Sequence, residues 1–223
     1  MKYLYILLLS IFFTNCVSIP KEYITNDNIC HYNDPIFKIT KEELTLNQNI
    51  LNQLKNREGD LVIVDNENFN SKFHNLSSEK IINYKTDKRL NIGKWLIYSK
   101  NGNIKSSELI YLNGTKKIKE ETHYNEQGNI TKVIDYEKGY NICWAEAIEI
   151  VKKIAKKDIE KYKITQFNLP FRVDLNKFPN EKPEWGVMLE KNENYEPKEN
   201  KVYWIDGVTG KFLRTTKIII THD

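Results

Sequence analysis

The sequence contains few of the residues that usually carry catalysis or metal binding. Its 223 residues include three cysteines and four histidines. The histidines are far apart in the chain and show no zinc-ligand spacing; they are His31, His74, His123 and His222. Neither a Cys-x-x-Cys pair, a Gly-x-Ser-x-Gly elbow nor a glycine-rich phosphate loop occurs. We therefore expect no catalytic, cofactor or metal site, and we interpret His123 as an ordinary residue of a sheet face.

Charge of one sign is also missing. The chain has 34 basic and 30 acidic residues, a net charge of only +4. This balance gives no reason to expect a nucleic-acid partner. Six lysines between residues 152 and 163 are expected on the solvated face of an amphipathic helix, and contact with an anionic surface is the alternative. They are Lys152, Lys153, Lys156, Lys157, Lys161 and Lys163.

Long hydrophobic runs are absent apart from one near the N-terminus. Leu4 to Phe13 is apolar except for Ser10 and follows the positive charge of Lys2. Ten helical residues span roughly 15 Å, about half of the hydrocarbon core of a bilayer. The run is therefore too short for a stable membrane helix and is typical of a signal peptide. We predict that residues 1–15 are removed.

The last residue of this run and the three that follow, Phe13-Thr14-Asn15-Cys16, resemble the lipobox of bacterial lipoproteins. The family usually has Leu three positions before the cysteine and a small residue just before it, where this chain has Phe13 and Asn15. The resemblance implies a diacylglycerol on Cys16, attachment to a membrane and a place in the bacterial cell envelope. Residues 16–39 are then the lipid attachment site and a tether. An ordinary secretory signal with a chance cysteine is the alternative.

Two cysteines remain once Cys16 is set aside. In an oxidising compartment Cys30 and Cys143 could form a disulfide that ties the N-terminal segment to the start of the last helix. Two buried free thiols are the alternative, because the sequence does not show whether the two residues lie close together.

Residues 40–92 are predicted to contain a helix and a strand. Thr40 and Glu43 fit a capping box, in which Thr40 bonds the Glu43 amide and Glu43 reaches back. The leucine and isoleucine spacing that follows predicts a helix to about Arg57. Leu61 to Val64 is predicted to be a short buried strand, and residues 66–90 give weak signals.

The middle of the chain is more regular. Tyr98, Tyr111, Tyr124 and Tyr136 are 13, 13 and 12 residues apart, and each precedes a glycine-containing turn. Asn-Gly pairs favour tight hairpins because both residues tolerate positive φ. The segments between the turns predict strands over residues 104–110, 117–122 and 130–135. Together these units predict an antiparallel β-meander.

Within this region, residues 93–102 follow the pattern Gly-x-Trp-x-x-Tyr-x-x-Asn-Gly. This pattern resembles the MORN-like repeats of antitoxin-type repeat proteins, and residues 124–130 resemble its second half. The resemblance covers residues 93–139. It implies a structural repeat with varied partners more than a particular function.

Residues 140–223 are predicted to form a helix and a small antiparallel sheet. Apolar residues at helical spacing predict a helix over residues 144–161. Strands are predicted at Phe171 to Leu175, Trp185 to Glu190, Val202 to Ile205 and Lys211 to Ile220, with Asp206 as a turn-forming residue. A helix on one face of an antiparallel sheet is an α+β arrangement. The four tryptophans are interpreted as core residues first: Trp95, Trp144, Trp185 and Trp204.

Two small families resemble this last segment. Tyr203 to Lys211 is similar to the strand and turn that end a PepSY domain, which implies protease inhibition or propeptide-like binding. Pro170 to Leu175 and Trp185 to Val187 resemble a nuclear-transport-factor-like immunity domain, which implies neutralisation of a toxin. Neither family is primarily enzymatic.

Taken together, these features predict a non-enzymatic envelope lipoprotein that binds a protein partner, of the immunity or antitoxin kind. A PepSY-type protease inhibitor or chaperone-like envelope protein is one alternative. An enzyme with an unrecognised site is another.

Overall fold

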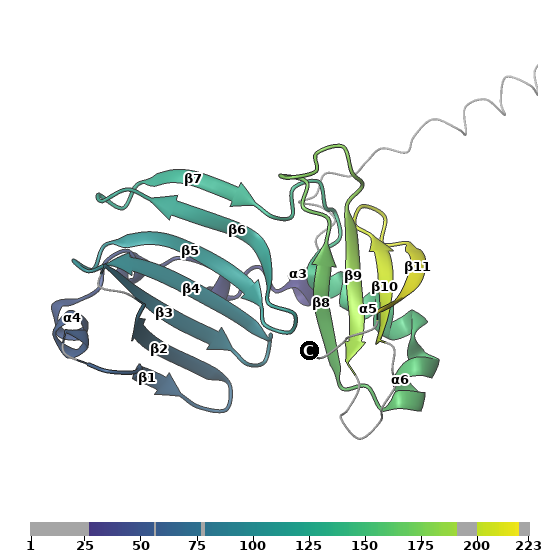
Figure 1. Ribbon diagram of the computed structural model, residues 1–223, viewed down its shortest axis with the longest axis horizontal. Helices are drawn as coiled ribbons and strands as arrows, with labels where there is room; N and C mark the ends of the chain where they lie inside the picture. The colour runs from purple at the N-terminus through teal and green to yellow at the C-terminus, as the bar shows by residue number, and fades with distance from the viewer. Residues whose placement is uncertain (1–26, 56, 77–78, 191–199, 219–223) are drawn as a thin grey trace, which may run out of the picture.

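The computed structural model describes residues 27–55, 57–76, 79–190 and 200–218. It contains a seven-stranded antiparallel sheet followed by a four-stranded antiparallel sheet, with helices beside them (Figure 1). The predicted α+β class, with a meander and then a helix on a smaller sheet, is confirmed. In the part of the chain that the structure describes, no helix is long and apolar enough to cross a membrane.

The large sheet is a simple meander in which every strand pairs with its neighbours in sequence. Its strands are β1 (Leu61–Asp65), β2 (Phe69–Asn75), β3 (Lys80–Asp87), β4 (Ile92–Ser99), β5 (Ile104–Tyr111), β6 (Lys116–Tyr124) and β7 (Ile130–Asp135). The three predicted strands of the repeat correspond to β5, β6 and β7. The sheet begins before the repeat, however, and crosses the boundary expected between residues 92 and 93.

The hairpins of the repeat use their glycines differently from the simplest Asn-Gly turn. Gly102 is left-handed at φ 89°, whereas Asn101 is not among the residues with positive φ. The Gly102 amide donates to the Ser99 carbonyl at 3.0 Å, and the β4–β5 register shifts at Tyr98. A tight turn followed by a glycine bulge produces this geometry. The turn that ends at Gly128 repeats it.

The edge strand β1 differs from its prediction as a buried strand. Leu61 is buried, but Val62 is 53% exposed and Ile63 and Val64 are exposed too. β1 pairs only with β2, through a bulge between Val62 and Val64. A continuous apolar run therefore marks the edge of the sheet here, and not its interior.

The N-terminal segment contains only short helices: α3 (Asp27–Cys30), η2 (Pro35–Phe37), η3 (Lys41–Glu43) and α4 (Gln48–Leu54). The predicted continuous helix from Thr40 to Arg57 is therefore wrong. The predicted capping box is confirmed: Glu43 accepts from the Thr40 amide at 2.9 Å, and the Thr40 side chain accepts from the Glu43 amide. The chain then runs beside the start of β5, where the Ile104 amide donates to the Leu44 carbonyl at 3.0 Å. That pairing separates η3 from α4.

The C-terminal part consists of α5 (Trp144–Ile154), α6 (Lys156–Tyr162), β8 (Gln166–Arg172), β9 (Glu184–Glu190), β10 (Asn200–Asp206) and β11 (Phe212–Ile218). The small sheet has the order β11-β10-β9-β8, and α5 packs against β9 and β10. The predicted single helix is broken at Ala155, which has φ −92° and ψ 12°. The first predicted strand, Phe171 to Leu175, is displaced, because β8 ends at Arg172. The last two residues of the final predicted strand lie outside the described residues.

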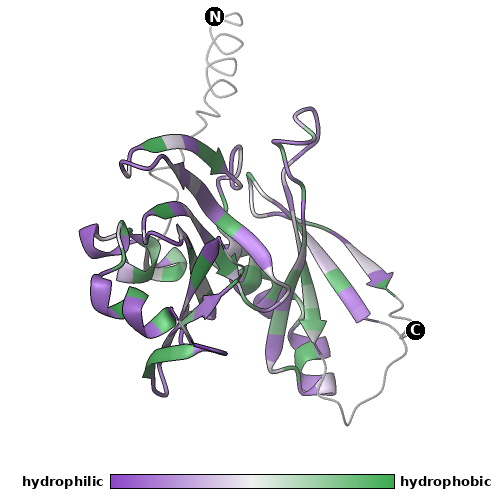
Figure 2. Ribbon diagram, turned by 60° about the vertical axis from the view of Figure 1, so that its left-hand side comes forward, coloured by the Kyte–Doolittle hydropathy of each residue, from purple (hydrophilic) through white to green (hydrophobic). Residues whose placement is uncertain are grey.

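The two sheets share one hydrophobic core. Its buried side chains come from the large sheet, from α5 and from the small sheet, for example Ile92, Val151 and Trp185. A second described cluster lies near α4 and includes Leu54 and Leu96. Hydrophobic and hydrophilic residues alternate along the strands, as expected for sheets with two different faces (Figure 2). The residues on either side of Gly139 therefore fold around a common interior.

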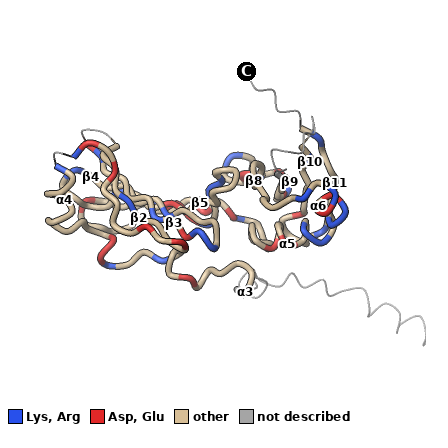
Figure 3. The backbone as a smooth tube through the Cα atoms, turned by 90° about the horizontal axis from the view of Figure 1, so that it is seen from below, with Lys and Arg blue, Asp and Glu red and all other residues tan. Residues whose placement is uncertain are grey.

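The helices leave one side of the molecule uncovered. In Figure 1, α3 and α5 lie behind the sheets, and the faces towards the viewer carry no described helix. Figure 3 shows the same arrangement from below, with α3 and α5 beneath the sheets. We call the uncovered side of the seven-stranded sheet the open face.

Candidate interaction face

A row of large side chains crosses the open face. Cross-strand pairing places one residue from each of β2, β3, β4 and β5 side by side. We call this set the open-face row: Lys72, Tyr84, Trp95 and Glu108. Directly opposed residues of antiparallel strands point to the same face and contact one another. The row is therefore a continuous surface feature built from four strands.

The centre of the row is an aromatic pair. The rings of Tyr84 and Trp95 meet edge to face, with centroids 5.2 Å apart, and both side chains are half-buried. The Lys72 Nζ lies 5.9 Å from the Tyr84 ring centroid. Tyrosine and tryptophan with a polar border are enriched at the energetic centres of protein interfaces. The expectation that Trp95 belongs to the core is thus not met, whereas Trp144 and Trp185 are buried.

Gly93 explains why the Trp95 side chain lies where it does. A Cβ at Gly93 would be 3.2 Å from the Trp95 Nε1 and 3.0 Å from the Leu112 Cδ2. The missing side chain therefore leaves room for the indole beside the strand. Tyr98, three residues later, points to the other face, is 1% exposed and donates to the Glu43 carbonyl at 2.9 Å. The Gly-x-Trp-x-x-Tyr pattern thus sends its tryptophan outwards and its tyrosine into the core.

Charged side chains continue the row towards β7. Lys117 forms ion pairs with Glu108 and with Glu121, the latter at 2.7 Å. His123 Nε2 lies 3.0 Å from Glu121 Oε1, and the Tyr136 hydroxyl donates to Glu121 Oε2 at 2.7 Å. We call Glu108, Lys117, Glu121, His123 and Tyr136 the open-face cluster. No sequence motif marks it, because its members come from three separate strand regions.

Lys117 and Glu121 of this cluster stay ionised at neutral pH. Burial works against the Lys117 ammonium, but hydrogen bonds with Glu108 and Glu121 outweigh it and raise the Lys117 pKa. Burial likewise works against the Glu121 carboxylate, yet Lys117 and Tyr136 lower the Glu121 pKa. Both pKa values therefore move away from neutrality, whereas general acid–base catalysts need values near it. The arrangement favours recognition by fixed charges.

A cleft of about 790 Å³ adjoins this cluster between the two sheets. It is lined by the start of β6, by Tyr136, by the end of β8 and by the loop after it. The lining residues are Thr115, Lys116, Lys117, Tyr136, Arg172, Val173, Asp174, Lys177, Phe178 and Glu181. Because Lys117 and Tyr136 belong to both features, the cleft and the open-face cluster are continuous.

Arg172 is the central cation of this cleft. Its guanidinium carbon lies 5.0 Å from the Tyr136 ring centroid and 6.0 Å from that of Trp185. Its Nη1 donates to the Lys117 carbonyl. Burial lowers the Arg172 pKa, whereas the charges of Glu137 and Asp174 act in the opposite direction. The aromatic rings and the backbone bond hold the guanidinium in place, and within the described residues no carboxylate lies within ion-pair distance of it.

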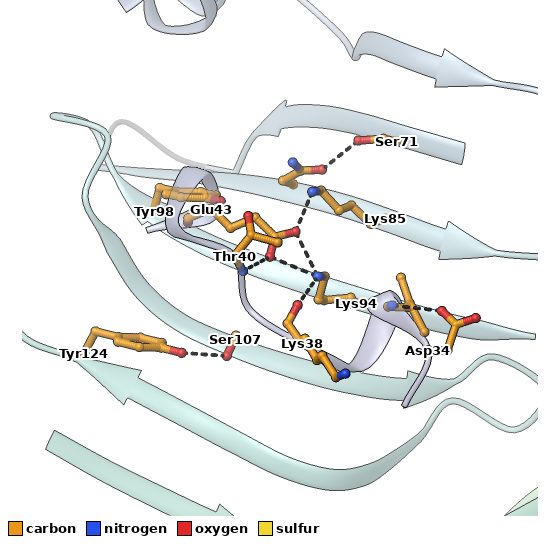
Figure 4. A network of polar contacts seen from close by, with 12 residues as sticks. Asp34, Lys38, Thr40, Glu43, Ser71, Lys85, Lys94, Tyr98, Ser107 and Tyr124 are labelled. Carbon is orange, nitrogen blue, oxygen red and sulfur yellow. Dashed lines mark hydrogen bonds and ion pairs between the residues drawn. The ribbon is translucent and has the colours of Figure 1, made fainter. Parts of the chain in front are cut away.

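The covered face of the sheet holds a different polar network (Figure 4). Glu43 accepts from Lys85 Nζ at 2.5 Å and from Lys94 Nζ at 3.0 Å. Lys94 also donates to the Lys38 carbonyl at 2.9 Å, and its side chain is only 4% exposed. The charges of Glu43, Lys85 and Lys94 each have a close partner within the chain. The network therefore attaches the N-terminal segment to β3 and β4, and it does not offer a free binding group.

The structure places the remaining predicted residues as follows. Cys30 and Cys143 are joined in a disulfide, with a Cα–Cα distance of 6.2 Å, and Cys143 is the N-cap of α5. Asp206 is a turn residue whose Oδ1 accepts from the Val208 and Thr209 amides. Cys16 and His222 lie outside the described residues.

We compared the chain with protein-family models, with curated proteins and with solved structures. No family model matches it, and no curated protein or solved structure is significantly similar. The resemblances to lipoproteins, MORN-like repeats, PepSY domains and immunity domains therefore stay predictions from the residues. A function has to be argued from the open face and the cleft.

Proposed function

We propose that this chain is a non-enzymatic lipoprotein of the bacterial cell envelope that binds a protein partner through its open face. The observation that carries the proposal is the half-exposed pair of Tyr84 and Trp95 in the middle of a charged row. Burying such a pair against a partner removes a large aromatic area from water, and fixed charges around it select the orientation.

The chemistry of the open-face cluster supports binding over catalysis. Lys117 stays protonated and Glu121 stays ionised around neutral pH, so neither exchanges a proton readily. His123 pairs with Glu121, and within the described part of the chain its side chain forms no hydrogen bond with a serine, threonine or cysteine. The same side chains present both charge signs in fixed positions, which suits complementary contact with a protein surface.

The membrane anchor is supported by the sequence around Cys16. Expressed in a bacterial host, the wild-type chain should carry a diacylglycerol-sized mass increment and partition into detergent. Cys16→Ala should lose the increment and stay in the aqueous phase. Intact mass spectrometry and detergent partitioning measure both. An aqueous wild-type protein of unmodified mass would contradict the anchor, while leaving binding by the open face untouched.

The binding proposal predicts a strong effect of Trp95. A photo-crosslinking residue at Ile97, which is half-buried on the open face, should capture a specific partner in the native host. Once that partner is purified, Trp95→Ala should weaken its affinity about 30-fold or more, since hot-spot residues contribute at least ~2 kcal/mol. Titration calorimetry measures the change in Kd.

Trp204→Ala is the matched control for this experiment. Trp204 is a half-buried tryptophan on the small sheet, where Phe171 and Arg214 contact its ring. Its replacement should leave the Kd of the partner unchanged. Equal losses in the two variants, or crosslinks that are as frequent from exposed Lys157 on α6 as from position 97, would refute an interface at the open face.

A further inference from the structure

The cleft between the sheets is lined by more cations than carboxylates. One cation, Lys117, is already paired with Glu108 and Glu121. The other charged residues of the lining are three cations and two carboxylates: Lys116, Arg172, Lys177, Asp174 and Glu181. Within the described ranges none of these five forms an ion pair, since no nitrogen and oxygen of theirs come within 4.0 Å.

The free donor of the cleft is on Arg172. Nη1 is committed to the Lys117 carbonyl, and Nε is buried without an acceptor. Nη2 is not among the buried atoms and has no acceptor in the described part of the chain. Because Tyr136 stacks near the guanidinium, the plane that carries Nη2 is fixed beside the cleft. A guanidinium held in this way is pre-organised to donate to an oxyanion.

We infer that the cleft binds a single carboxylate of the partner protein, with the Arg172 guanidinium as the principal donor and Lys116 and Lys177 as supporting charges. This inference rests on the proposed function, because the carboxylate would belong to the protein that covers the open face. The shared residues Lys117 and Tyr136 place the two contacts next to each other.

The charges of the cleft select a carboxylate over a phosphate. Asp174 and Glu181 line the same space as the cations, and they would repel a dianionic phosphate more strongly than a monoanion. The exposed ring of Phe178 and the side chain of Val173 also line the cleft. They suit the aliphatic stem or the neighbouring residues of an acidic peptide segment.

The inference can be tested on the full chain without a known partner. The probes are a capped pentapeptide with one glutamate, the same peptide with glutamine, and inorganic phosphate. NMR titration should show saturable shifts of the Arg172 side chain and the Lys117 amide with the glutamate peptide at millimolar concentration, and none with the glutamine peptide. Arg172→Gln should weaken this binding at least tenfold.

Two further variants keep the test independent of folding. The Lys177 side chain forms no hydrogen bond with another described residue, so Lys177→Gln should keep the fold and weaken the binding of the glutamate peptide about threefold. Arg57→Gln, at an exposed arginine whose side chain donates to the Asp60 carbonyl, should leave the binding of the glutamate peptide unchanged. Phosphate binding as tight as the peptide would overturn the single-carboxylate assignment. An absence of saturable shifts in wild type would overturn the site.

Failure of this inference is distinguishable from failure of the proposed function. The peptide titration reports on the cleft alone, and Trp95→Ala should leave the affinity for the glutamate peptide unchanged. Partner affinity reports on the open face. If the affinity for the partner depends on Trp95 but not on Arg172, the proposed function stands and the carboxylate site is refuted.

Discussion

Replacement of Glu43 by glutamine is expected to lower the free energy of unfolding by about 3–5 kcal/mol, because breaking a buried ion pair leaves a charge without its partner. The Lys94 side chain is 4% exposed and would keep its ammonium beside a neutral amide. Urea unfolding at neutral pH measures the effect. Combining the change with Lys94→Met should recover part of the loss, because the unpaired charge is then removed as well.

A matched control lies on α6. Glu160 pairs with Lys156 at 3.9 Å, with both side chains more than half exposed. Glu160→Gln should change the stability by less than about 0.5 kcal/mol, as is usual for surface pairs. Equal effects of Glu43→Gln and Glu160→Gln would show that the network on the covered face does not hold the N-terminal segment in place.

The effect of Glu43 should depend on pH in one direction. Burial alone would raise the Glu43 pKa, but hydrogen bonds from Lys85 and Lys94 keep this pKa below its ordinary value. A folded-state pKa below the unfolded one stabilises the fold at pH values above the unfolded pKa, and this stabilisation is lost as the pH falls through the folded pKa. The difference between wild type and Glu43→Gln should therefore shrink from pH 7 towards pH 3.

Removal of the disulfide is expected to cost the fold about 3–5 kcal/mol. Cys30 and Cys143 are separated by 113 residues, and a cross-link over a loop of roughly 100 residues removes a large part of the entropy of the unfolded chain. Both cysteines are buried in the shared core. Urea unfolding with and without a reductant measures the difference.

The double variant Cys30→Ala with Cys143→Ser is the appropriate comparison. Serine can keep the N-cap of α5, where the Cys143 Sγ now accepts from the Glu146 amide. The double variant should unfold at the same urea concentration as the reduced wild type. If oxidised and reduced wild type unfold together, the cross-link contributes nothing to stability, and the shared core alone joins the two sheets.

The strands that the sequence did not reveal are those with polar residues on the covered face. β2 and β3 place Ser71, Asn83 and Lys85 inwards, where these side chains find polar partners. The alternation of apolar and polar residues that normally predicts a strand is therefore absent. β5, β6 and β7 were predictable because glycine turns mark their ends and the residues between them are strand-length.

The helix prediction after Thr40 failed for a related reason. The capping box forms, but the residues that follow it bond to Gly102 and Ile104, two residues far along the chain. Local sequence rules cannot include such partners. The same limit hid the cleft, since Lys117, Tyr136 and Arg172 meet only through the packing of two sheets.

The disulfide also decides which part of the molecule bears a mechanical load. If the chain is anchored at Cys16, a pull from the membrane reaches Cys30 and passes through the sulfur bridge directly to Cys143 at the start of α5. Residues 31–142, with all seven strands of the large sheet, form a closed loop outside that line of tension. For a pull between the anchor and the C-terminal part, the open face would keep its shape, whereas a reduced molecule would pass the same tension to the bonds between Glu43, Lys85 and Lys94.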